Sequence, residues 1–169
     1  VYEKQTGGFV FKPGAIMTNL LLADEINRTS SKTQSALLEA MEEMRVTVDG
    51  QTYPLPSPFV VLATQNPVGS AGTQMLPSAQ MDRFMIKISM GYPDFESQIS
   101  ILRDRHRENP LDKIQPKVNI AELQQLIEEA SAVQVMDCIY EYVTKLTQAT
   151  RNHPMIALGV SPRGALAVC

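Results

Sequence analysis

Short apolar runs dominate the first half of the chain, and apolar residues at helical spacing dominate the second half. Leu20–Ala23 and residues 59–64 are runs of strand length, and continuous apolar runs of this length are typical of buried parallel strands. In the second half, apolar residues recur every three or four positions, which is typical of helices that bury one face. The pattern therefore predicts an α/β part over residues 1–91 and an all-α part over residues 92–169.

A helix and a hairpin are predicted between the two strands. The helix begins after Ser30 or Ser31, either of which can cap it, and its apolar positions up to Met44 recur at helical spacing. In residues 45–55, apolar and polar side chains alternate around Asp49-Gly50, a pair that suits a type I′ turn. The order strand, helix, strand indicates an α/β layer.

Weaker signals flank these elements. Residues 7–19 resemble a short hairpin-like segment that Pro13-Gly14 turns. A glycine-bearing loop over residues 68–74 leads to a short helix at residues 77–84, and the alternating polarity of residues 85–90 predicts a third strand.

Four helices are predicted in the second half, and two of them carry clear start signals. Asn119 precedes Glu122 by three residues, close to a capping box, and Ser161 is followed by Pro162 at the first helical position. The four predicted helices cover residues 93–106, 119–130, 135–150 and 161–168.

The composition is that of an ordinary globular protein. Of the 169 residues, 44% are hydrophobic and 20% are charged, and the formal net charge of -3 gives no strong attraction to nucleic acid or anionic membranes. No apolar run approaches the roughly 20 residues of a membrane span, and no signal peptide is visible. Cys138 and Cys169 lack metal-like spacing, and His106 and His153 are isolated. We therefore expect a reduced, cytoplasmic protein without a Cys/His metal site.

Two adjacent carboxylates, Asp24 and Glu25, directly follow the first apolar run. Like charges repel, so the pair is either an accident of an exposed loop or the partner of a bound cation. If the strand end faces a crevice, where open α/β sheets bind ligands, one carboxylate can hold hydrated Mg²⁺ and the next can activate a water. Asn66 follows the second run, either as a common loop starter or with its amide in the same crevice.

Two arginines are candidates for binding phosphate. Arg83 is either a surface cation paired with Asp82, worth under about 1 kcal/mol, or an arginine finger that stabilises a phosphoryl transition state. Arg163 follows Ser161-Pro162 at a predicted helix start, where a cation is slightly unfavourable unless an anion is nearby. This mismatch favours a phosphate-facing role for Arg163.

In this order, the segments resemble the AAA+ ATPases, specifically the MoxR family. The resemblance covers nearly the whole chain and is weakest over residues 109–116 and the middle helices. The stretches that carry it are NLLLADEINR, KTQSALLEAMEE, VTVDGQTYPLP, FVVLATQNP, LPSAQMDRF and GVSPRGAL.

The resemblance implies a role for each candidate residue. Asp24 and Glu25 match Walker B, with Asp24 as the support of Mg²⁺ and Glu25 as the catalytic base. Asn66 matches sensor 1, Arg83 the arginine finger and Arg163 sensor 2. Binding of ATP and Mg²⁺ is then assigned to Asp24, Glu25, Asn66 and Arg163, and catalysis to Glu25, Asn66 and Arg83.

The resemblance also implies a domain organisation. It places a partial AAA+ P-loop NTPase core, a parallel sheet with helices, over residues 1–91 and an α-helical lid domain over residues 92–169. Residues 7–19 match the helix-2 insert of this clade. Residues 45–55 match its pre-sensor-1 hairpin, which faces the central pore of a ring in related motors.

One motif of the family is missing from the sequence. There is no G-x-x-x-x-G-K-[ST] loop to cradle phosphate, and in the family this loop lies upstream of the point where the chain begins. The chain opens at Val1 without an initiator Met and stops at Cys169 within a helical-looking stretch. We therefore expect an internal fragment with a truncated lid, which is inactive when isolated.

The activity implied for the parent protein is ATP hydrolysis in a homo-oligomeric ring, expected to be hexameric, in which Arg83 completes the site of a neighbour. The ring would act as a chaperone-like motor on protein clients or in complex maturation, with a von Willebrand factor A-domain partner and no membrane. Alternatives are a magnesium-chelatase-like or MCM-like motor and a non-catalytic scaffold. The hairpin at residues 45–55 carries one Arg and one Asp, which argues against a nucleic-acid translocase.

Overall fold

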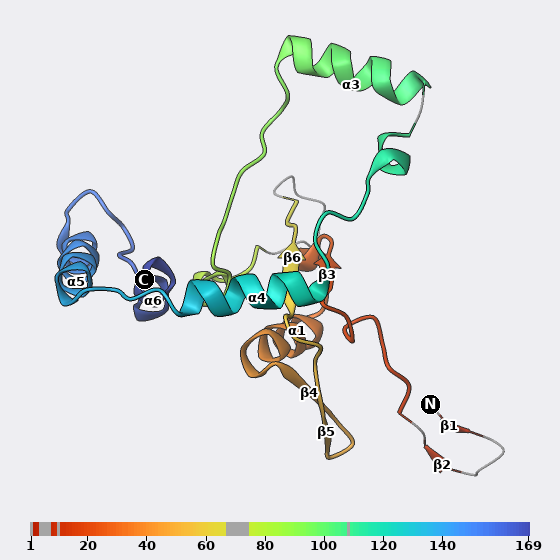
Figure 1. The fold of residues 1–169 in the computed structure, drawn as a ribbon, viewed down its shortest axis with the longest axis horizontal. Coiled ribbons are helices and arrows are strands. Elements are labelled where there is room, and N and C mark those ends of the chain that lie inside the picture. Colours follow the sequence, from red (N-terminus) through yellow and green to blue (C-terminus); the bar gives the residue numbers. More distant parts are fainter. Residues whose placement is uncertain (1, 4–7, 10, 67–74, 108) are drawn as a thin grey trace. The chain divides into compact units, whose positions relative to one another are not determined.

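The structure is a computed structural model that describes residues 2–3, 8–9, 11–66, 75–107 and 109–169 (Figure 1). Its contacts divide the chain into two compact units, of which the first comprises Val1–Met85 with Asp137–Cys169 and the second Ile86–Met136. The first unit contains every predicted site residue. The assignment of residues 1–91 to a core and of 92–169 to a lid stays a prediction.

A two-stranded parallel sheet lies in the first unit. Strand β3 (Leu20–Ala23) pairs with β6 (Val60–Ala63) from Leu20 opposite Val60 to Ala23 opposite Ala63, and the two strands lie side by side in Figure 1. Parallel strands need a crossover connection, which here contains the helix α1 (Ser31–Glu43). The predicted α/β layer is confirmed, and the carboxyl ends of both strands lie at the same edge.

The two faces of this sheet differ in burial. Leu21 and Val61 pack against a core cluster that includes the buried Phe59. On the other face, Leu20 and Leu22 are 60% and 63% exposed within the described part of the chain. The prediction of fully buried strands is therefore wrong for this face. An apolar run in the sequence does not show whether one face of the strand or both faces are covered.

Helix α1 and the hairpin after it follow local signals. The Ser30 hydroxyl accepts a hydrogen bond from Thr33 N at 3.2 Å, which confirms Ser30 as the cap. The helix ends at Glu43 with Met44 as its C-cap, and strand β4 (Arg45–Val48) then pairs with β5 (Gln51–Pro54). Both turn residues, Asp49 and Gly50, have positive φ (51° and 76°), as a type I′ turn requires.

The predicted third strand is absent, and its prediction was wrong. Residues 85–90 form no strand, and Ile86 and Ile88 are 74% and 78% exposed. A strand needs neighbouring backbone groups for its hydrogen bonds, and no strand among the described residues pairs with this segment. The predicted helix at residues 77–84 is shorter, since α2 covers Ser78–Met81.

The start of the chain differs from the predicted hairpin. Strands β1 (Tyr2–Glu3) and β2 (Gly8–Phe9) pair antiparallel, so the pairing begins earlier than predicted. Gly14 still turns the chain, because its carbonyl accepts a hydrogen bond from Met17 N at 3.0 Å. Residues 7 and 10 of this segment, and the predicted loop over 68–74, lie outside the described residues.

The second unit contains helices that the sequence predicted. They are α3 (Phe95–Arg107) and α4 (Ile120–Ser131), and a short 3-10 helix that the sequence did not predict, η2 (Pro110–Lys113), lies between them in the chain. Both hydrogen bonds of the capping box are present at α4: Glu122 N donates to Asn119 Oδ1 at 2.9 Å, and Asn119 N donates to Glu122 Oε2 at 2.8 Å. The predicted helix start is confirmed.

The last two helices belong to the first unit. Helix α5 (Asp137–Asn152) leads to α6 (Pro162–Val168), and the Ser161 hydroxyl caps α6 by accepting a hydrogen bond from Gly164 N at 2.9 Å. Gly159 permits the return of the chain, because a Cβ at this position would lie 2.5 Å from the Arg151 Cα. In the described part of the chain, no helix combines the length and apolar character needed to cross a membrane.

Candidate functional site

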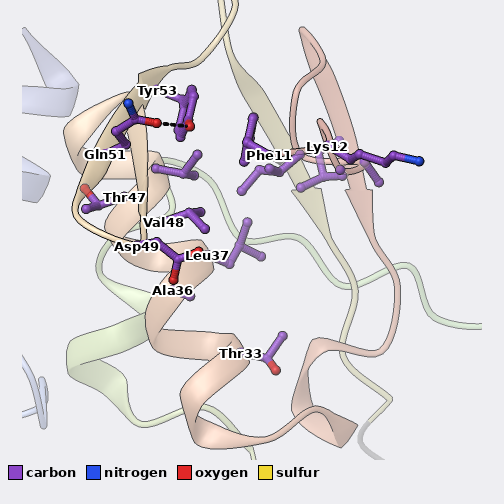
Figure 2. Close-up of a pocket in the computed structure, with 15 residues that line it drawn as sticks. Phe11, Lys12, Thr33, Ala36, Leu37, Thr47, Val48, Asp49, Gln51 and Tyr53 are labelled. Atoms are coloured by element: carbon purple, nitrogen blue, oxygen red, sulfur yellow. Dashed lines mark hydrogen bonds between the residues drawn. The ribbon is translucent and has the colours of Figure 1, made fainter. Parts of the chain in front are cut away.

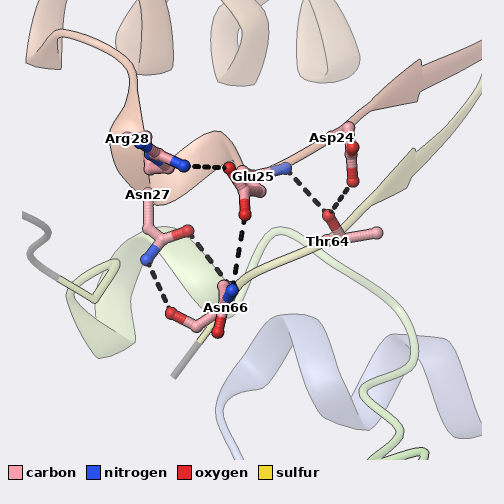
Figure 3. A network of polar contacts seen from close by, with 6 residues as sticks. All are labelled: Asp24, Glu25, Asn27, Arg28, Thr64 and Asn66. Atoms are coloured by element: carbon pink, nitrogen blue, oxygen red, sulfur yellow. Dashed lines mark hydrogen bonds and ion pairs between the residues drawn. The ribbon is translucent and has the colours of Figure 1, made fainter. Parts of the chain in front are cut away.

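Polar side chains of two neighbouring strands meet at the edge where both strands end (Figure 3). Asp24 and Glu25 follow β3, and Thr64 and Asn66 follow β6. Backbone hydrogen bonds continue past the strands, since Thr64 N donates to the Ala23 carbonyl at 3.1 Å. We call Asp24, Glu25, Thr64 and Asn66 the strand-end cluster.

Thr64 connects the two carboxylate residues. Its hydroxyl donates to Asp24 Oδ1 at 2.5 Å and accepts a hydrogen bond from Glu25 N at 2.8 Å. Figure 3 shows the hydroxyl between the Asp24 side chain and the Glu25 backbone. The side chain that directly follows β6 therefore fixes both acidic residues that follow β3.

The Glu25 carboxylate is held by donors on both oxygens. Arg28 Nη1 donates to Oε2 at 2.7 Å, and Asn66 Nδ2 donates to Oε1 at 3.4 Å. The hydrogen bond from Arg28, followed by that from Asn66, lowers the pKa of the Glu25 carboxyl below its ordinary value of 4.5. Glu25 is therefore ionised at neutral pH, and each oxygen keeps a further lone pair for a water.

The backbone at Glu25 has an unusual conformation. Its φ of 47° and ψ of 48° lie in the left-handed region, which costs a non-glycine residue about 1–2 kcal/mol. The buried Asn27 supports this turn, because its amide donates to the Asn66 carbonyl at 3.2 Å and its side-chain oxygen accepts from Asn66 N at 3.4 Å. Gln34 of α1 adds a hydrogen bond to the Ile26 carbonyl at 3.1 Å.

The two candidate arginines lie together on other elements of the same unit. Arg83 Nη1 lies 2.5 Å from Glu42 Oε2, and Arg163 Nη2 contacts Glu42 Oε1. Asp82 Oδ2 lies 3.8 Å from Arg163 Nη1, and Asp82 Oδ1 accepts a hydrogen bond from the Ser161 hydroxyl at 2.7 Å. We call Glu42, Asp82, Arg83 and Arg163 the arginine cluster.

The five predicted residues thus form two groups. Asp24, Glu25 and Asn66 come together as the shared strand edge requires, whereas Arg83 and Arg163 meet on Glu42. The alternative that Arg83 pairs with Asp82 is wrong, because its carboxylate partner is Glu42. The anion that the sequence suggested beside Arg163 is supplied within the chain by Glu42 and Asp82.

Sequence reasoning missed four residues of these groups. Thr64 stands at the strand end two residues before Asn66, and Arg28 stands three residues after Glu25, so position could have suggested both. Asn27 and Glu42 carried no such signal, because their contacts join segments that are far apart along the chain. These additional residues are Asn27, Arg28, Glu42 and Thr64.

A separate pocket of about 770 Å³ lies between the hairpin, α1 and residues 11–16 (Figure 2). Its lining is mostly apolar, and Phe11 stacks on Tyr53 with ring centroids 3.8 Å apart. Neither Asp24 nor Glu25 lines it. The strand-end cluster therefore lies outside this pocket.

The donor set at the strand ends suits a hard cation. Asp24 offers a carboxylate and Thr64 a hydroxyl, and Mg²⁺ takes oxygen ligands, commonly one or two carboxylates with phosphate oxygens and waters. No group of three or more His, Cys, Asp or Glu placed to hold a metal occurs among the described residues.

The chain resembles known proteins over almost its full length. A model of the ATPase family associated with various cellular activities (AAA) matches residues 1–86. The chain is 49% identical over 99% of its length to the uncharacterised protein YeaC of Bacillus subtilis and 38% identical over 99% to Chaperone MoxR1 of Mycobacterium tuberculosis. A crystal structure of a protein from Cytophaga hutchinsonii, described as an ATPase, matches 99% of the chain at 39% identity with a TM-score of 0.85.

These relatives are longer than the chain. It spans 52% of YeaC, 46% of Chaperone MoxR1 and 54% of the Cytophaga hutchinsonii protein. The predicted fold class is confirmed by the family match and the structural match. The chain belongs to the ATPase family associated with various cellular activities, as a MoxR-type member.

Proposed function

We propose that the protein to which this chain belongs hydrolyses ATP, with Glu25 as the base that activates water. The observation that carries this proposal is the contact between Glu25 and Asn66 across the ends of β3 and β6. An ionised carboxylate and an amide that face each other at the edge of a parallel sheet form a site where a water can be oriented and deprotonated.

Each residue of the strand-end cluster has a distinct task in this proposal. Mg²⁺, held through Asp24, would supply positive charge to the phosphates. Glu25 would accept the proton of the attacking water, a contribution of about 10²- to 10⁴-fold in rate. Asn66 would orient that water, and Thr64 would keep the two carboxylates in register.

Arg83 would act on the nucleotide of a neighbouring subunit in a ring, which we expect to be hexameric. Arg163 contacts the same carboxylate as Arg83, so we place it at the same neighbouring nucleotide. Their guanidinium groups suit phosphate oxygens, because the planar fork binds two oxygens at once. Arg83 would serve as the arginine finger and Arg163 as sensor 2, a binding role.

With no phosphate-cradling loop in its sequence, the isolated chain would hydrolyse essentially no ATP.

We further propose a protein as the client of this motor. Support comes from the 38% identity to Chaperone MoxR1 and from the β4–β5 hairpin, which carries no basic stripe for nucleic acid. A von Willebrand factor A-domain partner, a cytoplasmic location and a lid role for the helices after residue 92 belong to the same proposal. A magnesium-chelatase-like or MCM-like motor and a scaffold are the alternatives.

The test is Glu25→Gln in the full-length protein. We expect ATP binding to stay within about twofold of wild type while turnover falls at least about 100-fold, because Gln keeps the shape but cannot take the proton. ATP binding and steady-state phosphate release measure the two effects. Glu43→Gln is the matched control, since Glu43 forms an exposed ion pair with Arg45. Undiminished turnover in Glu25→Gln would contradict the assignment.

A further inference from the structure

A single carboxylate joins the two candidate phosphate-binding arginines. Glu42, near the end of α1, places one oxygen on Arg83 and the other on Arg163. These arginines come from segments 80 residues apart along the chain, one after α2 and one in the first turn of α6. Glu42 is therefore the point at which three separate elements of the first unit meet.

The environment of this bridge holds both cations in place. The side chains of Glu42 and Arg83 are only 33% and 32% exposed, so solvent screens their pairing less than that of a fully exposed ion pair. Two guanidinium groups repel each other unless an anion lies between them, and Glu42 supplies that anion. Asp82 adds a second negative charge, and its hydrogen bond from Ser161 ties α2 to the start of α6.

We propose that Glu42 is a positioning residue, which holds Arg83 and Arg163 as a pair presented to the phosphates of the neighbouring subunit. The inference rests on the proposed function of the two arginines and assigns the residue that orients them. Glu42 itself would touch no nucleotide. Its carboxylate prearranges two cations whose individual side chains are long and otherwise free to change rotamer.

The chemistry of substitution at this position is specific. Gln keeps the length of the side chain, but it replaces one of the two carboxylate oxygens by an amino group, so that one of the two guanidinium groups faces a donor in place of its acceptor. The neutral amide also leaves the repulsion between Arg83 and Arg163 uncompensated. Glu42→Gln should therefore separate the arginines without removing either of them.

The experiment compares Glu42→Gln with Glu39→Gln in the full-length protein. Glu39 lies on the same helix, one turn earlier, and is exposed. We expect Glu42→Gln to lower kcat about 10- to 100-fold with KM within about threefold, because a shift of about 1 Å in a positioned group can cost about 100-fold in rate. Glu39→Gln should leave kcat within about twofold of wild type.

Mixed rings separate a positioning role from simple damage to the fold. Glu25→Gln subunits have intact arginines, and Glu42→Gln subunits have an intact Glu25. When Glu42→Gln subunits are mixed with Glu25→Gln subunits, the Glu42→Gln subunits should regain hydrolysis. Arg83→Ala subunits should also regain hydrolysis in a separate mixture with Glu25→Gln subunits. A Glu42→Gln variant that keeps or exceeds wild-type kcat, or that no mixture restores while Arg83→Ala is restored, would overturn the inference.

The Arg83→Ala mixture also reports on the proposed function itself. If Glu25→Gln restores neither Arg83→Ala nor Glu42→Gln, the action of Arg83 on a neighbouring subunit is refuted, and the inference about Glu42 is overturned with it. If Glu25→Gln restores Arg83→Ala alone, only the role of Glu42 is overturned. Restoration of both variants supports both proposals.

Discussion

The strand-end cluster and the arginine cluster are built on opposite principles. In the first, donors from Thr64, Asn66 and Arg28 surround two carboxylates. In the second, two carboxylates surround two guanidinium groups. Arg28 offsets only one of the two carboxylates in the first cluster, whereas Glu42 and Asp82 offset both guanidinium groups in the second.

The two clusters differ in the ligand groups that they suit. Anionic oxygens at the strand ends suit a cation and a water, whereas guanidinium groups suit phosphate oxygens. If the clusters act in different subunits, as proposed, a site is complete only where two copies meet. Variants of the two clusters should then complement each other in mixed rings, while variants within one cluster should not.

Among the tests of this comparison, the largest effect is expected from Thr64→Val compared with Thr64→Ser. Val keeps the shape but loses both the donor to Asp24 and the acceptor for Glu25 N, whereas Ser keeps them. We expect kcat to fall about 10- to 100-fold in the Val variant and to stay within about threefold in the Ser variant. Steady-state hydrolysis by the full-length protein measures both.

Mixing extends this test to the comparison of the clusters. Thr64→Val damages the strand-end cluster, so Arg83→Ala subunits should restore its activity, and Glu25→Gln subunits should not. Restoration by both kinds of subunit, or equal rates for the Val and Ser variants, would break the distinction between the clusters.

A smaller effect is expected from removing helix caps. Ser161→Ala and Ser30→Ala each delete an N-cap, which costs about 1 kcal/mol and should speed amide exchange in the capped helix about fivefold. Ser161 also binds Asp82, so only Ser161→Ala should lower hydrolysis and be restored by Glu25→Gln subunits. Hydrogen exchange by mass spectrometry and mixed-ring assays measure the two effects. An equal loss of hydrolysis in both variants would show that the Asp82 contact is irrelevant.

The smallest effect concerns the pH dependence of Glu25. Arg28 is the main cause of the lowered pKa, so Arg28→Ala should raise that pKa toward its ordinary value of 4.5. A base with a higher pKa is protonated earlier on acidification, so the acid limb of the kcat profile should move to higher pH. Arg45→Ala, which breaks another exposed pair, should leave the limb in place. A limb that does not move in Arg28→Ala would contradict the role of Arg28.

The lowered pKa of Glu25 also determines how the stability of the fold depends on pH. A carboxyl whose pKa is lowered on folding stabilises the folded state above the unfolded-state pKa, and this contribution is lost as the pH falls through the folded-state pKa. The contribution of Glu25 is therefore complete at neutral pH. In Arg28→Ala, the loss on acidification should begin at a higher pH than in wild type.

Local signals in the sequence were sufficient for three helix starts and for the hairpin turn. The caps at Ser30, Asn119 and Ser161 and the turn at Asp49-Gly50 involve residues within four positions of each other, so their hydrogen bonds can be foreseen from spacing. The shared strand edge was also predictable, because two apolar runs that flank a helix favour parallel pairing.

Features that depend on distant segments were not predictable. The segment at residues 85–90 has the alternation of a strand, but pairing requires a neighbour that alternation does not report. Glu42 looked like any surface glutamate of a helix until α2 and α6 brought two arginines to it. The contacts of the Thr64 hydroxyl could not be predicted without the register that sets β6 beside β3.

The left-handed backbone at Glu25 raises the question of why this position carries a glutamate and not a glycine. Glycine would adopt this conformation without steric penalty and would make the loop easier to form. A glutamate here gives up folding stability, and neighbouring amides must compensate for it. Stability alone would favour glycine at position 25, and the proposed role of Glu25 as a base accounts for a carboxylate there.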